Sequence, residues 1–82
     1  MFYSIISQTN TKTHKQYIVR IGFNASRGYR TKLILISYDK GYEWMAFPIY
    51  KSEVDYSVEL AQVRYKANFK DILNLVFSHY LR

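Results

Sequence analysis

The spacing of apolar residues changes period once along this chain, close to residue 51. In residues 17–23 apolar side chains occupy every second position, and residues 42–49 alternate in the same way, which is typical of β-strands. Beyond residue 52 apolar side chains recur every third or fourth position, the spacing of an amphipathic helix. The pattern predicts an α+β fold in which residues 1–50 form a sheet and the remainder is helical.

About four antiparallel strands are expected in the sheet. Residues 2–7 are rich in β-branched and aromatic side chains, and residues 33–36 are apolar on both faces, as in a central strand. Asp39, Lys40 and Gly41 have the composition of a hairpin turn. Pro48 indicates that the last strand ends there or lies at an edge.

One or two helices are expected after the sheet. Ser52 is a candidate N-cap for a helix over 52–66, and Asn68 is a candidate N-cap for a second helix over 69–81. One continuous helix with a kink near Asn68 is an alternative. A strand over 63–69 is another, because Val63, Tyr65, Ala67 and Phe69 also alternate.

The length and composition predict a single domain over residues 1–82. The chain contains no Cys, which excludes disulfides and zinc–thiolate sites and favours a reducing compartment. No stretch approaches the roughly 20 apolar residues that span a bilayer, and the N-terminal segment does not resemble a signal peptide. We therefore expect a soluble cytoplasmic protein with no membrane partner, located in the host cytoplasm if it is viral.

All of the net charge of +6 comes from the first half of the chain. Residues 39–82 carry six basic and six acidic side chains, whereas residues 1–38 carry no acidic side chain and six basic ones: Lys12, Lys15, Arg20, Arg27, Arg30 and Lys32. A one-sided positive field attracts polyanions or acidic protein surfaces. The densest cluster, residues 27–32, includes Gly28, which can adopt a positive φ in a phosphate-gripping loop.

Aromatic residues suggest how a nucleic acid could be held. We expect one face of the sheet to pack against helix through Val19, Ile21, Phe23, Met45, Phe47 and Ile49. The opposite face would present Ile18, Arg20, Gly22, Tyr42 and Trp44, with the glycine leaving room for unpaired bases to stack. The expected nucleic-acid site therefore comprises Arg20, Arg27, Tyr29, Arg30, Lys32, Tyr42 and Trp44, extended by Lys12 and Lys15. Alternatively, the protein's own helix, a second copy or a protein partner covers this face.

Catalytic and metal-binding patterns are weak. His14 and His79 have no acid or nucleophile at an informative spacing. Asp55 and Glu59 are four residues apart on the expected helix, where acids ordinarily cap the first turn rather than chelate a cation. No metal, cofactor or enzymatic activity is expected. An RNase toxin is a minor alternative, because such enzymes can work with Arg, Lys and Tyr.

One segment is similar to a known family. Pro48, Ile49 and Tyr50, followed by Asp55, Glu59 and Tyr65, resemble a strand-into-helix stretch of the small early bacteriophage inhibitors of host RNA polymerase. The similarity covers about 18 of the 82 residues, and this chain lacks the acidic character of that family. In general character it is similar to small phage host-takeover proteins, and its expected element order looks like that of coactivator-type single-stranded nucleic-acid binders.

Two functional hypotheses follow. The first is a small non-enzymatic accessory protein that binds RNA or single-stranded DNA through its basic N-terminal half. The second, which the phage resemblance implies, is an inhibitor that blocks a host nucleic-acid-processing protein, such as a nuclease toxin, restriction enzyme or polymerase, either alone or with RNA as part of the complex. A homodimer is compatible with either.

Overall fold

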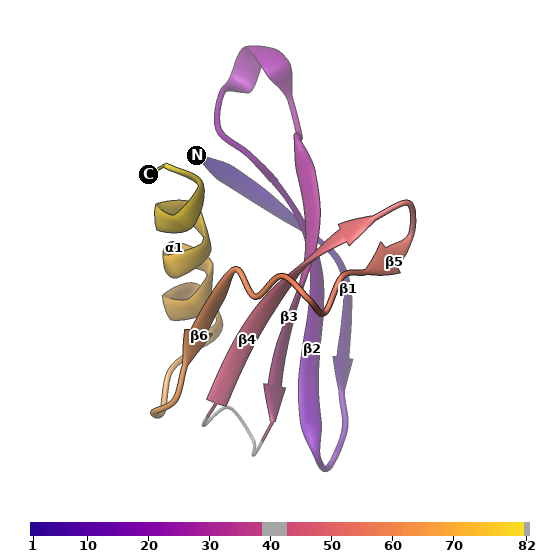
Figure 1. The fold of residues 1–82 in the computed structure, drawn as a ribbon, viewed down its shortest axis with the longest axis vertical. Coiled ribbons are helices and arrows are strands. Elements are labelled where there is room, and N and C mark those ends of the chain that lie inside the picture. The colour runs from indigo at the N-terminus through magenta and orange to yellow at the C-terminus, as the bar shows by residue number, and fades with distance from the viewer. Residues whose placement is uncertain (39–42, 82) are drawn as a thin grey trace.

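In the part of the chain that the structure describes, a single antiparallel sheet is accompanied by a short 3₁₀ turn and one C-terminal helix (Figure 1). The computed structural model describes residues 1–38 and 43–81. Its elements in chain order are β1 (Phe2–Asn10), β2 (His14–Gly22), the 3₁₀ turn η1 (Ala25–Arg27), β3 (Thr31–Tyr38), β4 (Glu43–Tyr50), β5 (Glu53–Val54), β6 (Ala61–Val63) and α1 (Phe69–Tyr80). The α+β class is confirmed, and the described sheet has more strands than the four expected.

The first four strands follow one another as a meander. β1 pairs with β2, β2 with β3 and β3 with β4, all antiparallel. The predicted strands in residues 1–50 are therefore confirmed, whereas the expected turn at Asp39, Lys40 and Gly41 lies outside the described residues. β5 and β6 both pair with β4 on the side away from β3, so two short strands share the far edge of the sheet.

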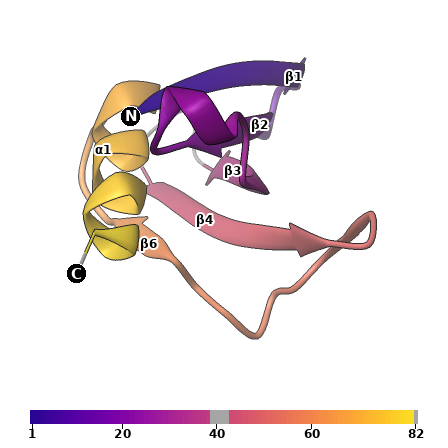
Figure 2. The ribbon, with the colours of Figure 1, turned by 90° about the horizontal axis from the view of Figure 1, so that it is seen from above.

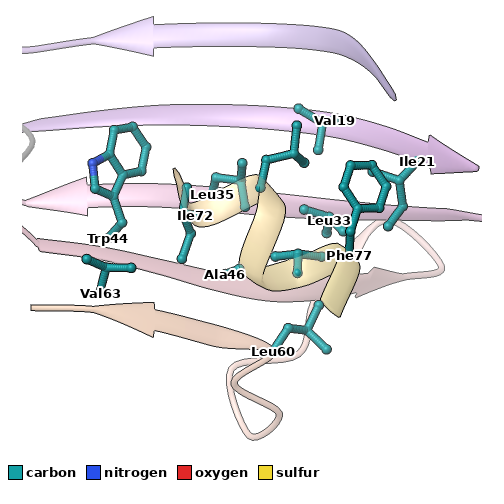
Figure 3. Packing of buried hydrophobic residues seen from close by; sticks show 12 residues of the cluster. Val19, Ile21, Leu33, Leu35, Trp44, Ala46, Leu60, Val63, Ile72 and Phe77 are labelled. Atoms are coloured by element: carbon teal, nitrogen blue, oxygen red, sulfur yellow. The ribbon is translucent and has the colours of Figure 1, made fainter. Parts of the chain in front are cut away.

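Helix α1 covers one face of the sheet and closes the main core. Figure 3 shows Ile72 and Phe77 of the helix directed toward sheet residues such as Leu33 and Leu35. The buried set of this core is Val19, Ile21, Leu33, Leu35, Trp44, Ala46, Leu60, Val63, Ile72, Leu73, Val76 and Phe77. Seen from above, the helix stands at one side, and the β4–β5 hairpin extends away from it (Figure 2).

The start of α1 agrees with the sequence prediction. The Asn68 side chain accepts a hydrogen bond from the Asp71 backbone N–H at 3.0 Å, and the Asp71 carboxylate accepts one from the Asn68 N–H at 2.9 Å. This reciprocal capping box satisfies two of the free N–H groups at the start of a helix. The second predicted helix, 69–81, is thus confirmed as α1. At 12 residues it is too short to cross a bilayer, and no other helix within the described ranges is long and apolar enough to do so.

The helix predicted over 52–66 is wrong. Lys51 and Ser52 have φ values of 50° and 67°, and they form a turn that folds β5 back onto β4. Further along, the Leu60 N–H donates to the Ala46 carbonyl at 2.8 Å, and β6 continues the pairing with β4. The edge of β4 offers backbone groups that need partners, so strand pairing replaces the helix that the local spacing suggested. The alternative strand over 63–69 is also not formed, because β6 ends at Val63.

The orientation expected for β4 is also wrong. Val19 and Ile21 pack beneath α1, and Phe23 contacts Phe77 and Tyr80, as expected. In β4, however, Trp44 and Ala46 face the helix, whereas Met45, Phe47 and Ile49 lie on the other face with Ile34 and Ile36. This strand is apolar on both faces, so alternation alone does not determine which side meets the helix.

Candidate nucleic-acid interface

Two cations lie directly opposite each other on the face of the sheet turned away from α1, hereafter the open face. Arg20 of β2 pairs with Lys32 of β3, and both side chains are exposed. Ser4 of β1 is the neighbour of Arg20 on its other side, and Ile49 of β4 is the neighbour of Lys32. Like charges on facing strand positions destabilise a sheet, so this pair is costly unless an anion lies between or above it.

The loop before β3 adds a third cation and an aromatic ring to this pair. The guanidinium carbon of Arg20 lies 4.6 Å from the centre of the Tyr29 ring, a cation–π arrangement. The Arg30 backbone N–H donates to the Ile21 carbonyl at 2.9 Å, which holds the loop end against β2. We call Arg20, Tyr29, Arg30 and Lys32 the basic cluster.

The geometry of the loop agrees with the sequence prediction for its glycine. Gly28 adopts φ 68° immediately after η1, a backbone conformation in the left-handed half of φ space that glycine adopts without strain. The Asn24 side chain caps η1 by accepting from the Ser26 N–H at 3.0 Å. The loop therefore turns sharply at Gly28 and returns Tyr29 to the sheet.

A shallow hollow of about 210 Å³ opens at the basic cluster. It is lined by Arg20, Tyr29, Arg30, Thr31 and Lys32. Among the described residues, this lining offers three cationic side chains, a hydroxyl and a phenol, but no carboxylate. Arg27 ends η1 as an exposed residue and is not among the lining residues. The hollow can accept an anion through forked N–H groups and an ammonium group.

The space expected above Gly22 is occupied by the protein itself. Phe2 of β1 pairs with Gly22, and a Cβ added to Gly22 would lie 2.3 Å from the Phe2 ring and 2.6 Å from the Gly28 carbonyl oxygen. The Phe2 ring in turn meets the Tyr29 ring edge-on, with centroids 5.2 Å apart. No room for a base therefore remains at Gly22, and the Phe2 ring instead packs against Tyr29.

Trp44 does not belong to the open face. Its side chain is 3% exposed, and its indole N–H donates to the Ala67 carbonyl at 3.0 Å. The expectation that Trp44 stacks on bases is wrong, because the indole is part of the core beneath α1. Tyr42, the other aromatic residue expected there, lies outside the described residues.

The two N-terminal lysines lie apart from the basic cluster. Lys15 precedes Arg20 by five residues in β2, which separates their Cα atoms by about 16 Å in an extended strand and places them on opposite faces. Lys15 lines a second hollow of about 380 Å³ together with Lys66 near the start of α1. Lys12 is exposed in the β1–β2 hairpin. The structure thus unites four of the nine predicted site residues and separates Lys12, Lys15, Arg27 and Trp44 from them.

Sequence reasoning missed two contributors. Phe2 supports the aromatic part of the cluster, and Lys66 faces the hollow of Lys15 although it belongs to the electrically neutral half. The alternation in β1 and β2 could have identified Phe2 if their register had been known. Nothing in the local sequence around Lys66 indicates that it shares a hollow with Lys15, because this depends on how residues 64–68 return to the sheet.

The described titratable groups outside the basic cluster form no metal-binding constellation. No group of three or more His, Asp or Glu side chains suited to a metal occurs within residues 1–38 and 43–81. The His14 Nδ1 atom lies 3.1 Å from the Thr11 hydroxyl in the β1–β2 hairpin. The Asp55 carboxylate accepts from the Ser57 N–H at 3.0 Å, so it caps a turn rather than a helix.

The open face also carries an apolar strip beside the basic cluster. Ile34, Ile36 and Phe47 are buried among their neighbours, and four half-buried side chains pack around them: Ile18, Met45, Ile49 and Val54. Tyr56 covers one edge of Phe47, with ring centroids 5.1 Å apart. Because the four surrounding side chains are only half-buried, some apolar surface adjoins the positive charge on this face.

Comparison with known proteins gives no relative: no family model, curated protein or solved structure matches this chain. The resemblance to small phage proteins stays a prediction.

Proposed function

We propose that this protein is a non-enzymatic binder of RNA or single-stranded DNA, and that the basic cluster is its phosphate-binding site. The observation that carries the proposal is the direct pairing of Arg20 with Lys32 across β2 and β3. Two facing cations lower the stability of the sheet. A bound phosphate reverses this cost, because it is attracted by both.

The surroundings of the pair fit an extended polyanion. Arg30 enlarges the positive surface at the same hollow, which holds no carboxylate among its described lining residues. Tyr29 is 44% exposed and is held by Arg20 on its ring and by Phe2 at its edge. An aromatic ring fixed beside cations provides a stacking surface for an unpaired base next to its phosphate. Such binding is tolerant of sequence and strongly salt-dependent.

Two charge-matched variants test the site. The first replaces Arg20, Arg30 and Lys32 by Gln. The second, the control, replaces the exposed residues Arg64, Lys66 and Lys70 by Gln, at the opposite end of the strands. Both lower the net charge by the same amount, so any difference between them reflects position.

Fluorescence anisotropy with labelled single-stranded RNA, single-stranded DNA and duplex DNA gives the readout. We expect the first variant to lose most affinity for single strands, and its log-affinity against log-salt slope to flatten by about 2, the equivalent of three phosphate contacts. The control variant should keep both affinity and slope largely unchanged. Equal losses in the two variants would show a diffuse field without a site.

A second candidate function, the inhibitor of a host nucleic-acid-processing protein, is favoured by the apolar strip that adjoins the basic cluster. Protein interfaces combine such apolar surface with arginine. Capture of a host protein from lysate that persists after nuclease treatment, and is lost in the variant at Arg20, Arg30 and Lys32, would favour this function over nucleic-acid binding. Capture that disappears with nuclease would favour the nucleic acid.

A further inference from the structure

The two edges of the sheet differ greatly in length. On one side, β4 is covered by the two-residue β5 and the three-residue β6. On the other side, β1 is nine residues long and pairs only with β2 in the part of the chain that the structure describes (Figure 1). The outer edge of β1 therefore presents the longest row of unpaired backbone N–H and C=O groups on this sheet.

β1 also lacks most of the features that prevent an edge strand from pairing with a strand of another molecule. Residues 1–11 contain no Lys, Arg, Asp, Glu or Pro, which are the residues that commonly discourage edge-to-edge pairing. A bulge between Ile5 and Ser7 is the one irregularity in its register with β2. It divides the strand into two regular stretches, each of which retains its backbone donors and acceptors.

Apolar side chains are exposed along the same edge. Ile5 and Ile6 are 43% and 45% exposed, and Tyr3 is partly exposed beside Phe69, with ring centroids 5.7 Å apart. Helix α1 packs chiefly against β6, β4 and β3, so it leaves this side of the sheet largely uncovered. A neighbouring strand at β1 would bury these side chains together with the backbone edge.

We propose that β1 pairs antiparallel with β1 of a second copy of this chain, which makes a closed two-fold dimer with one continuous sheet. The free backbone groups of this edge are the attraction, and the charge distribution makes it the place where a second copy meets least repulsion. Two chains of charge +6 repel each other through most of their surfaces, whereas residues 1–11 bring no like-charged side chains together. Because each copy uses its one long edge, the association ends at two copies.

The dimer has a geometric consequence for the basic cluster. An antiparallel pair related by a two-fold axis perpendicular to the sheet keeps both open faces on one side. The two β2 strands, each of which carries an Arg20, are then three strand spacings apart in the continuous sheet, a distance of about 14 Å. This consequence concerns nucleic acid only if the proposed function holds, while the dimer itself does not depend on it.

Analytical ultracentrifugation of the nuclease-treated full chain tests the dimer. We expect a reversible monomer–dimer equilibrium that shifts toward dimer as salt rises, because salt screens the repulsion between the copies. Nucleic-acid binding has the opposite salt dependence, so failure of one proposal is distinguishable from failure of the other. A chain that stays monomeric up to about 1 mM at every salt concentration, or one that forms larger assemblies, overturns the closed dimer.

Ile5→Lys and Leu75→Lys form a matched pair of variants. Leu75 lies on α1 and is 42% exposed, so the two substitutions add the same charge at nearly equal exposure. Ile5→Lys places two lysines near the proposed interface and should weaken the dimer at least about tenfold, whereas Leu75→Lys should leave it unchanged. The reverse result overturns the proposal.

Single cysteines give a measurement that does not depend on weakening the fold. The chain has no Cys, so Ser4→Cys, Ser7→Cys and Thr9→Cys can each be compared with Ser78→Cys on α1. The two-fold axis between the two β1 strands places one position of β1 opposite the same position of the other copy, and mild oxidation should link fastest the variant whose cysteine lies nearest to that axis. Crosslinking at Ser78→Cys as rapid as at every β1 position contradicts the proposed interface.

Discussion

The indole N–H of Trp44 donates a hydrogen bond to the carbonyl of Ala67, 3.0 Å away and two residues before α1 begins. Trp44 stands near the start of β4, so the bond links the sheet to the segment that leads into the helix. Tyr17 of β2 packs against both Trp44 and Phe69, with ring centroids 5.9 Å and 4.6 Å apart. These contacts fix the position of the N-terminus of α1 on the sheet.

Replacement of Trp44 should therefore affect stability first. We expect Trp44→Ala to lower the free energy of unfolding by about 3–5 kcal/mol through the cavity that it leaves. Trp44→Phe should cost less, but it leaves the Ala67 carbonyl without its donor, a loss of about 1–3 kcal/mol. Urea unfolding followed by circular dichroism measures both.

Tyr65→Ala is the control for Trp44, because Tyr65 is 70% exposed two residues before Ala67. It should change the free energy of unfolding by less than about 0.5 kcal/mol. A Trp44→Ala variant as stable as the wild-type protein would mean that the indole is not part of the core.

Gly22 should tolerate no side chain. Gly22→Ala places a methyl group 2.3 Å from the Phe2 ring and 2.6 Å from the Gly28 carbonyl oxygen. The ring can move, but the carbonyl belongs to the backbone of the loop that carries Tyr29, so we expect a loss of about 1–3 kcal/mol. Thermal unfolding measures this loss.

A double variant separates the two clashes at Gly22. Adding Phe2→Ala to Gly22→Ala removes the contact with the ring and leaves the contact with the backbone. The double-mutant cycle should show partial rescue. The hydrogen bond from the Arg30 N–H to the Ile21 carbonyl should hold the loop in place. Full rescue would contradict this, because it would mean that the loop moves freely.

The parts of the fold that follow local rules were predictable. Alternation identified β2 and β4, residue composition identified β1 and β3, and Asn68 with Asp71 three residues later identified the start of α1. Residues 52–66 follow the same kind of rule and still form no helix. There the deciding partner is the free edge of β4, which is distant in the sequence from Leu60 and Val63. Local spacing carries no information about that partner.

The candidate site was predictable only in part for a similar reason. Arg20, Arg30 and Lys32 were identified from charge alone, but their meeting depends on the register of β2 with β3. Trp44 lies in the core and not in the site because of the face that β4 turns toward the helix, which its sequence does not determine. Both faces of β4 are apolar, with Ala46 and Phe47 each buried, so the sequence pattern is equally consistent with either orientation.

Tyr80 should make stability sensitive to alkaline pH. Burial raises the pKa of its phenol above the usual 10.0, and the nearby Tyr50 adds to this effect, while the Thr31 side chain opposes it. The folded protein therefore holds this proton more tightly than the unfolded chain does. The resulting stabilisation is complete below about pH 10 and is lost as the pH rises through the folded-state pKa.

Comparison with Tyr80→Phe isolates this contribution from the other tyrosines and the lysines. Below about pH 10 the unfolding free energies of the two proteins should differ by a constant amount. Above it the wild-type protein should lose stability faster than the variant. Curves that stay parallel through this range would show that Tyr80 ionises equally easily in both states.

Tyr29 should contribute to nucleic-acid affinity through its ring. If it stacks on a base, Tyr29→Ala should weaken binding of a short single-stranded oligonucleotide by about 1–3 kcal/mol, while Tyr29→Phe keeps most of the affinity. Tyr65→Ala, at an exposed tyrosine outside the basic cluster, is the control and should bind as the wild-type protein does. Trp44, the single tryptophan, lies in the core, so its fluorescence should not be quenched by direct stacking. Strong quenching of Trp44 together with an unaffected Tyr29→Ala variant would place the bound strand elsewhere on the protein.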